Sequence, residues 1–246
     1  MTQHSSSTES NSFVERQITS SMKLILRGDS QHLAGPLFAI NWFDARPAWL
    51  YHLYNFLASS QLKKIGGKPF FKGHVTRTLS GDDTLARKHL LIINYPSAEH
   101  FLNLVSGKVF LAISVLRMLS VRRFSFVMHR RVDEIKPLNE DLERAYALVH
   151  FSADEPKSAV QVIENAAQDS RVDVSFIGQE SVRVVSETQS KDSQATENPM
   201  EFVTPNTMLL SAESDERLDE CFRGESMQSA LAQTSQHYAA LIRRTV

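Results

Sequence analysis

The chain has 246 residues, of which 42% are hydrophobic and 22% are charged, a composition typical of globular proteins. Its 27 basic and 28 acidic residues give a formal net charge of -1, which argues against a protein that coats nucleic acid. A single cysteine, Cys221, excludes an intramolecular disulfide and a multi-thiolate metal site. The cysteine count also fits a reducing cytoplasm.

The N-terminal segment is polar and lacks the basic start and apolar run of a secretory signal. The polar composition of residues 1–33 therefore predicts a flexible tail. The most apolar stretch, Val109–Val121, is too short for a bilayer crossing, which takes roughly 20 apolar residues. We expect a soluble, cytoplasmic protein with no membrane span.

Apolar runs and turn signals alternate through the first half of the chain. The predicted order is a strand at 36–43, a helix from Pro47 to Gly66, strands at 69–79 and 89–95, a helix that follows Ser97 and is interrupted at Gly107, and a strand at 124–131. Proline suits the first turn of a helix, and serine suits an N-cap. The resulting β-α-β-β-α-β order is the ferredoxin-like unit.

The same order recurs after a charged linker at 134–144. At an offset of 117 residues, Ser97 falls on Ser214 and Gly107 falls on Gly224. The pattern predicts a tandem duplication, whereas the alternative is a chance similarity of two ordinary strand–helix units. The predicted domains are 34–133 and 145–246, the second with a mobile insertion at 188–203 and one helix before its last strand.

Several segments of the first half resemble the dimeric α/β-barrel superfamily of ferredoxin-like proteins, most closely a domain family of unknown function. They are AINWF at 39–43, Tyr51 and Tyr54, IGGKPFFKGHV at 65–75, and LLIINYPSAEHFLNLVSGKVFLAI at 90–113. The resemblance implies that two sheets, each with helices on one face, pair through their other faces. The predicted fold is therefore α+β, with two tandem ferredoxin-like (β-α-β-β-α-β) units packed as an internal dimeric α/β barrel.

The sequence departs from the family pattern at several positions. Arg87 and Lys88 stand where the family has an acidic Trp-Asp pair, and Leu116 and Arg117 stand where it often has His-Arg. In the second half, Val149 replaces Asn41, and the Gly-Gly pair and both tyrosines are missing. A family pocket is therefore expected in the first half, with the second half as a structural partner.

Polar side chains on otherwise apolar elements are the candidates for that pocket. The candidate catalytic residues are His74 and Arg117, and the candidate substrate-binding residues are Asn41, Tyr51, Tyr54 and Lys72. Histidine suits a general base near neutral pH, and arginine or lysine suits an oxyanion or carboxylate. The structural alternative is that Asn41 bonds the backbone, the tyrosines cap the core, and Lys72 is solvated.

Other chemistries find little support. There is no HExxH motif, no metal-finger spacing, no phosphate-binding glycine loop and no GxSxG elbow, and Cys221 is expected to be a buried, inert thiol. We expect no metal and no cofactor. Some relatives with this fold bind haem, which leaves a haem-binding barrel as an alternative with His74, His150 or His237 as the axial residue.

The expected function is binding of a small apolar or aromatic metabolite. The resemblance implies cofactor-independent oxygenation, isomerisation or cyclisation for some relatives. The alternative from another class is a non-catalytic interaction or scaffold protein. We expect a monomer with an internal pseudo-dimer, or a homodimer. We expect no nucleic-acid partner, because the basic segment of Arg117, Arg122, Arg123, Arg130 and Arg131 is interpreted as a solvated helix end paired with acids of the linker.

Overall fold

The computed structural model describes residues 35–81, 83, 86–131, 144–182 and 206–245. The predicted tail at 1–33, the insertion at 188–203 and all of the predicted linker except Arg144 lie outside these residues. The elements of the first half are β1 (Leu37–Ala45), α2 (Ala48–Lys64), β2 (Lys68–Gly81), β3 (His89–Tyr95), α3 (Ala98–Ser106), α4 (Lys108–Ser120) and β4 (Val121–Arg131). Those of the second half are β5 (Ala145–Ser152), α5 (Pro156–Asp169), β6 (Asp173–Val182), β7 (Asn206–Ala212), α6 (Asp215–Arg223), α7 (Glu225–Ala232) and β8 (Gln236–Arg244).

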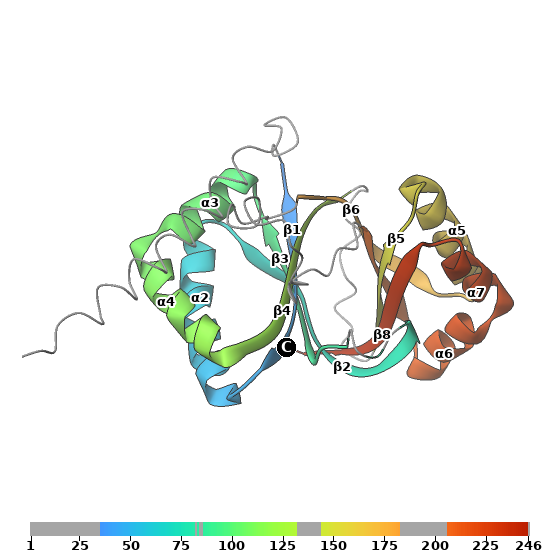
Figure 1. The fold of residues 1–246 in the computed structure, drawn as a ribbon, viewed down its shortest axis with the longest axis horizontal. Helices are drawn as coiled ribbons and strands as arrows, with labels where there is room; N and C mark the ends of the chain where they lie inside the picture. Colours follow the sequence, from blue (N-terminus) through green and yellow to red (C-terminus); the bar gives the residue numbers. More distant parts are fainter. Residues whose placement is uncertain (1–34, 82, 84–85, 132–143, 183–205, 246) are drawn as a thin grey trace, which may run out of the picture.

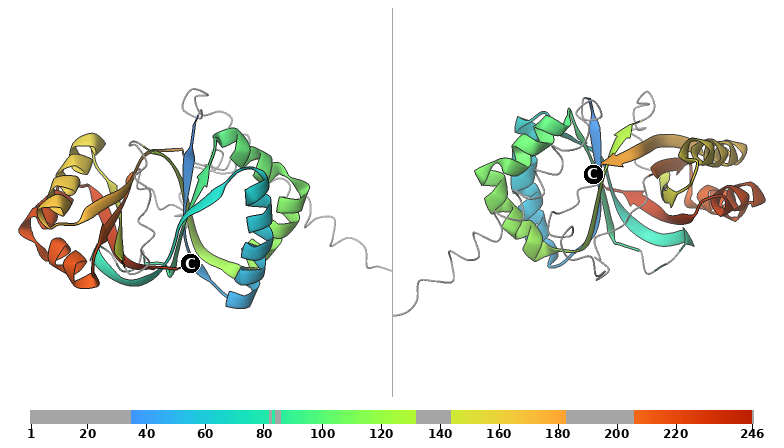
Figure 2. Two further views of the ribbon diagram at one scale, coloured as in Figure 1. Left: turned by 180° about the vertical axis from the view of Figure 1, so that it is seen from behind. Right: turned by 45° about the horizontal axis from the view of Figure 1, so that its top comes forward.

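The strands form one closed barrel in the order β1-β3-β2-β8-β5-β7-β6-β4. Each half contributes four neighbouring strands, with β1 and β3 central in the first and β5 and β7 central in the second. The halves meet at two antiparallel seams, β2 with β8 and β4 with β6. The helices of each half cover the outside of its own sheet (Figure 1; Figure 2). The predicted fold, two ferredoxin-like units in an internal dimeric α/β barrel, is confirmed.

Equivalent positions of the two units have the same strand register. Asn41 lies opposite Leu91 in the first unit, and Val149 lies opposite Met208 in the second. The offset is 108 residues between β1 and β5 and 117 residues between β3 and β7. The register therefore identifies which side chains of the two units occupy matching places.

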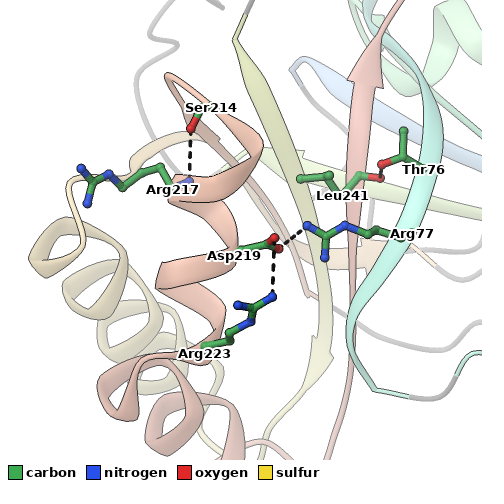
Figure 3. A network of polar contacts seen from close by, with 7 residues as sticks. All are labelled: Thr76, Arg77, Ser214, Arg217, Asp219, Arg223 and Leu241. Carbon is green, nitrogen blue, oxygen red and sulfur yellow. Dashed lines mark hydrogen bonds and ion pairs between the residues drawn. The ribbon is translucent and has the colours of Figure 1, made fainter.

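The helices start and stop at the residues with the strongest local signals. The Ser97 hydroxyl accepts a hydrogen bond from the His100 backbone N–H (3.4 Å), and Ser214 caps α6 in the same way through Arg217 (3.3 Å; Figure 3). Gly107 has an extended backbone that separates α3 from α4, as predicted. Gly224 does the same between α6 and α7, so the single helix predicted for this part of the second half is wrong.

Three hydrophobic clusters fill the spaces inside and outside the barrel. The interior cluster contains side chains from both units, including Phe38, Trp42, Tyr146, Phe176 and Tyr238, all nearly or fully buried. A second cluster lies under the helices of the first unit, and a third lies under those of the second. The interior is thus a shared core, whereas each helix layer belongs to one unit.

A polar cluster crosses the barrel interior between the two units. The Thr207 hydroxyl lies 2.7 Å from His129 Nε2 and 2.9 Å from His150 Nδ1, and all three side chains are buried. His129 is on β4 of the first unit, and His150 and Thr207 are on β5 and β7 of the second. Burial lowers the pKa of each histidine to about 3, so both imidazoles are neutral at pH 7.

A charged cluster ties the outer side of the β2–β8 seam to α6 (Figure 3). Asp219 of α6 pairs with Arg77 of β2, and Arg223 Nη2 lies 3.8 Å from the same carboxylate. Beside it, the Thr76 hydroxyl donates a hydrogen bond to the Leu241 carbonyl (3.2 Å). The cluster adds ion pairs to the backbone hydrogen bonds of the seam, but the Arg77 and Arg223 side chains are exposed to solvent.

We expect Asp219→Asn to lower the free energy of unfolding by only about 1 kcal/mol, because Arg77 is 43% exposed and solvent screens the pair. The measurement is urea-induced unfolding followed by circular dichroism. Glu220→Gln is the control, since the partner of Glu220 among the described residues is exposed Arg217 on the same helix, and we expect its effect to stay below about 0.5 kcal/mol. Equal losses for the two variants would show that the seam contact contributes nothing.

Among the described residues, no single helix has the length and hydropathy to cross a bilayer. The helices α3 and α4 reach that length and composition only when taken together, and their axes bend by 81° at the break between them.

Candidate functional site

The candidate site lies in the helix layer of the first unit, between the sheet and the helices α2 and α4. Ring contacts run through it from Tyr51 to Phe43 (5.0 Å between ring centroids), from Phe43 to His89 (5.5 Å), and from His89 to His74 (5.2 Å). Phe43 also contacts Phe124 at 6.4 Å. The period of two residues along a strand places these side chains on the outer face of the sheet.

Arg117 brings a positive charge into this aromatic layer. Its guanidinium carbon lies 5.1 Å from the centre of the Phe124 ring, a cation–π geometry. On α4 it follows the buried residues Ile113 and Ser114 at helical spacing, so it occupies a position that faces the sheet. Arg117 makes no ion pair with any residue that the structure describes.

Two tyrosines lie within electrostatic range of this guanidinium. Burial raises the pKa of Tyr54 and of Tyr95 above the ordinary value, and the charge of Arg117 opposes that rise. Burial also raises the pKa of Tyr51, whose ring is stacked on His89 and tilted against Phe43. All three phenols are therefore protonated at neutral pH and can donate hydrogen bonds.

His89 is the titratable group at the centre of the ring contacts. Burial lowers its pKa, the charge of His74 lowers it further, and Asp44 acts in the opposite direction. Its imidazole is therefore mainly neutral at pH 7, with one nitrogen able to accept a proton. The candidate set predicted from the sequence did not contain His89. Its contact with His74 depends on a cross-strand register that one strand alone does not reveal.

The six predicted site residues divide into two groups. Tyr51, Tyr54 and Arg117 lie together in the helix layer, and His74 reaches it through His89. The Asn41 amide donates to the backbone carbonyls of Ala39 (3.2 Å) and Leu91 (3.1 Å), as the structural alternative expected. Lys72 is exposed on β2, on the same strand face as His74, and its charge contributes to the lowered pKa of His89.

The second unit matches this set only in part, because Phe151 takes the place of Phe43 while the other matching places differ. The strand register puts Ala212 in the place of Tyr95, Val149 in the place of Asn41 and Asn206 in the place of His89. All three are buried. The helix α5 presents Ala159, Val160, Ile163, Ala166 and Ala167 to its sheet. The Cys221 thiol lies in the same apolar layer, buried as predicted, and burial raises its pKa.

The basic segment that begins at Arg117 is dispersed in the fold. Arg123 turns back to β1, where its Nε lies 2.6 Å from the carboxylate of buried Asp44. Arg122 is exposed at the start of β4. The predicted pairing with acids of the linker lies outside the described residues, as do the side chains of Arg130 and Arg131.

The histidines considered as axial ligands do not fit a haem. His237 has both ring nitrogens near hydroxyl partners, Ser80 at 2.9 Å and Thr234 at 3.2 Å. His150 is held by Thr207 in an interior filled with side chains. His74 is exposed, and its ring meets a second imidazole, that of His89, rather than an open apolar wall. None of these three histidines therefore has surroundings that suit an axial haem ligand.

Comparisons with known proteins agree with this fold. No protein-family model and no curated protein sequence matches the chain. A mutant chlorite dismutase from Candidatus Nitrospira defluvii, in complex with cyanide, is similar with a TM-score of 0.50 at 9% identity, over 92% of this chain and 95% of that one. A haem-binding protein from Thermus thermophilus has a TM-score of 0.44 at 10% identity, over 85% of this chain and 91% of that one. A protein of unknown function from Rhodopseudomonas palustris has a TM-score of 0.39 at 21% identity, over 41% of this chain and 85% of that one.

At these identities the likeness concerns the fold alone. The fold defines the class: proteins in which two ferredoxin-like units close one barrel.

Proposed function

We propose that this chain is a member of the dimeric α/β-barrel superfamily that binds a small aromatic carboxylate in the helix layer of its first unit. The observation that carries the proposal is Arg117, a cation that faces the sheet among aromatic rings and has no carboxylate partner among the described residues. A partly buried charge without a counter-charge is costly. A ligand carboxylate would supply that counter-charge.

The surroundings of Arg117 suit the rest of such a ligand. The Phe43 and Phe124 rings offer apolar faces on which an aromatic ring packs. The neutral hydroxyls of Tyr54 and Tyr95 offer hydrogen bonds to a carboxylate or phenol oxygen. The register places Phe151 where Phe43 lies but Ala212 where Tyr95 lies, so the fold itself does not demand a tyrosine hydroxyl at that place.

His89 extends the proposal from binding to reaction class. Its neutral imidazole lies beside the rings of Phe43 and Tyr51, where it can accept a proton from a bound ligand. The proposed chemistry is cofactor-independent proton transfer, as in isomerisation or cyclisation. His89→Gln separates the candidates: an enzyme loses turnover and keeps binding, whereas a binding protein keeps its affinity and has no turnover to lose.

We expect Arg117→Met to weaken binding of salicylate by about tenfold or more, because one charge-assisted contact is lost. Isothermal titration calorimetry with salicylate and with its neutral amide, salicylamide, measures the effect. The amide should bind both proteins equally. Arg122→Gln is the control, since Arg122 is exposed in the same basic segment.

Native mass spectrometry of the freshly purified protein provides the companion observation, an aromatic acid retained by the wild type and lost in Arg117→Met. Unchanged salicylate affinity in Arg117→Met would refute the role of the cation. A bare chain that binds neither probe would refute the proposed site.

A further inference from the structure

The outer face of α2 and α4 is apolar where a helix on a water-soluble fold is normally polar. Among the described residues, every large hydrophobic side chain that is exposed lies on these two helices. Phe56 is 77% exposed and Trp49 is 67% exposed. Helices α5, α6 and α7, which cover the second unit, have none. The apolar surface is therefore a property of the first unit and not of the fold.

Six of these seven exposed side chains, all except Val109, form two stripes. On α2 the spacing of Trp49, Leu53 and Phe56 is i, i+4, i+7, and on α4 Val115, Met118 and Leu119 share one side. This side of α4 is opposite to the one that carries Arg117 toward the sheet. We call the surface made by the two stripes the α2/α4 face.

The two helices run side by side in opposite directions (Figure 1; Figure 2). The backbone N–H of Arg46, just before α2, donates to the carbonyl of Ser120, the last residue of α4, at 2.7 Å. The start of α2 therefore lies beside the end of α4, and the two apolar stripes come together. The exposed Lys63 and Lys64 end α2 and Lys108 begins α4, so these three ammonium groups gather toward the other end of the same face.

The α2/α4 face also has an unbalanced charge. Helices α2 and α4 contain no Asp or Glu, and each contains basic residues. Exposed Arg46 and Arg122 flank the apolar end. Each helix of the second unit, in contrast, carries at least one acid. In a chain with a net charge of -1, basic side chains without acidic neighbours on the same two helices thus flank the exposed apolar surface of the described residues.

We propose that the α2/α4 face docks onto the surface of an anionic phospholipid bilayer. Exposed tryptophan, phenylalanine and leucine side chains enter the region between headgroups and acyl chains, and flanking lysine and arginine side chains meet the lipid phosphates. A second copy of the chain is a poorer match for the charge, because α2 and α4 offer no carboxylate to the basic groups of a facing copy. The two antiparallel helices form a broad face that suits a flat partner.

Vesicle binding tests the proposal, and Trp49 provides the signal. Trp42 is buried in the barrel and Trp49 is exposed, so a blue shift of fluorescence on vesicle addition reports the α2/α4 face alone. The full chain is mixed with vesicles of pure phosphatidylcholine or of phosphatidylcholine with about 30% phosphatidylglycerol. We expect at least tenfold stronger partitioning to the anionic vesicles, together with the blue shift, and loss of the shift in Trp49→Phe.

Three variants separate the apolar and the charged contributions. We expect Phe56→Ser, and separately the triple change of Lys63, Lys64 and Lys108 to Gln, each to weaken partitioning at least fivefold. Lys157→Gln on exposed α5 is the matched control and should leave it unchanged. All substituted side chains are exposed, and unaltered circular dichroism verifies the fold.

Two results would overturn the proposal. One is equal binding, or no binding, to the two kinds of vesicle. The other is a stable dimer in native mass spectrometry that Phe56→Ser dissociates, which would assign the α2/α4 face to a second copy.

Discussion

Acidification from pH 7 to pH 4.5 is expected to lower the free energy of unfolding by roughly 5 kcal/mol, mainly through His129 and His150. Both histidines are buried, and the pKa of each is lowered to about 3 in the folded protein. In the unfolded chain they take up protons at the ordinary pKa of about 6.5. Above about pH 6.5 both histidines are neutral in the folded and the unfolded chain, so they cause no loss in the free energy of unfolding. As the pH falls from there toward 3, each histidine lowers the free energy of unfolding by about 1.4 kcal/mol per pH unit.

Urea-induced unfolding at several pH values, followed through Trp42 in a Trp49→Phe background, measures this dependence. Trp42 is a suitable probe because its ring lies 5.9 Å from that of His150. His52→Gln, on the exposed side of α2, should keep the full pH dependence. The double variant His129→Gln with His150→Gln should lose most of it, at the cost of lower stability at pH 7. Histidine signals that titrate near pH 6.5 at these two positions would contradict the prediction.

Gly81→Ala is expected to lower the free energy of unfolding by about 3 kcal/mol or more, because strain and a clash coincide. Gly81 has a φ of +90°, and an added Cβ would lie 2.5 Å from the His237 carbonyl oxygen and 3.0 Å from the Tyr238 Cα. Both atoms belong to the backbone of β8, so no rotamer change relieves the contact. The substitution would open the β2–β8 seam at its end.

Gly66→Ala is the control for the backbone conformation alone. Gly66 also has a positive φ, +71°, but an added Cβ would only touch Pro96 Cγ at 3.4 Å. We expect a loss of about 1 kcal/mol, measured by the same urea unfolding. Similar losses for the two variants would show that the contact with β8 does not matter.

Local signals in the sequence predicted most of the elements. Proline at 47, serine at 97 and glycine at 107 act on their immediate neighbours, and the helices begin and end there. The start of β4 was predicted at 124, but the strand begins at Val121. Arg122 and Arg123 were interpreted as part of a solvated helix end. A bulge opposite β1 and the Arg123–Asp44 pair hold them in the strand.

The contacts that close the barrel could not be predicted in this way. His129, His150 and Thr207 look like isolated polar residues in three separate strands, and only the closed sheet brings them together. The candidate site shows the same limit. Tyr51 and Tyr54 were singled out as polar side chains on an otherwise apolar helix, whereas the contact of His74 with His89 requires a register between strands.

The barrel interior and the two helix layers differ in which amino-acid substitutions they tolerate. The barrel interior contains side chains of both units, so a substitution there has to remain compatible with residues that lie a hundred positions away. The buried residues of each helix layer come from one unit. At the β2–β8 seam, Leu79 and Arg77 of β2 also contact the helix layer of the second unit. Selection can therefore modify one helix layer while the other stays as it is. A fold of this kind allows one half to specialise while the other keeps the scaffold intact.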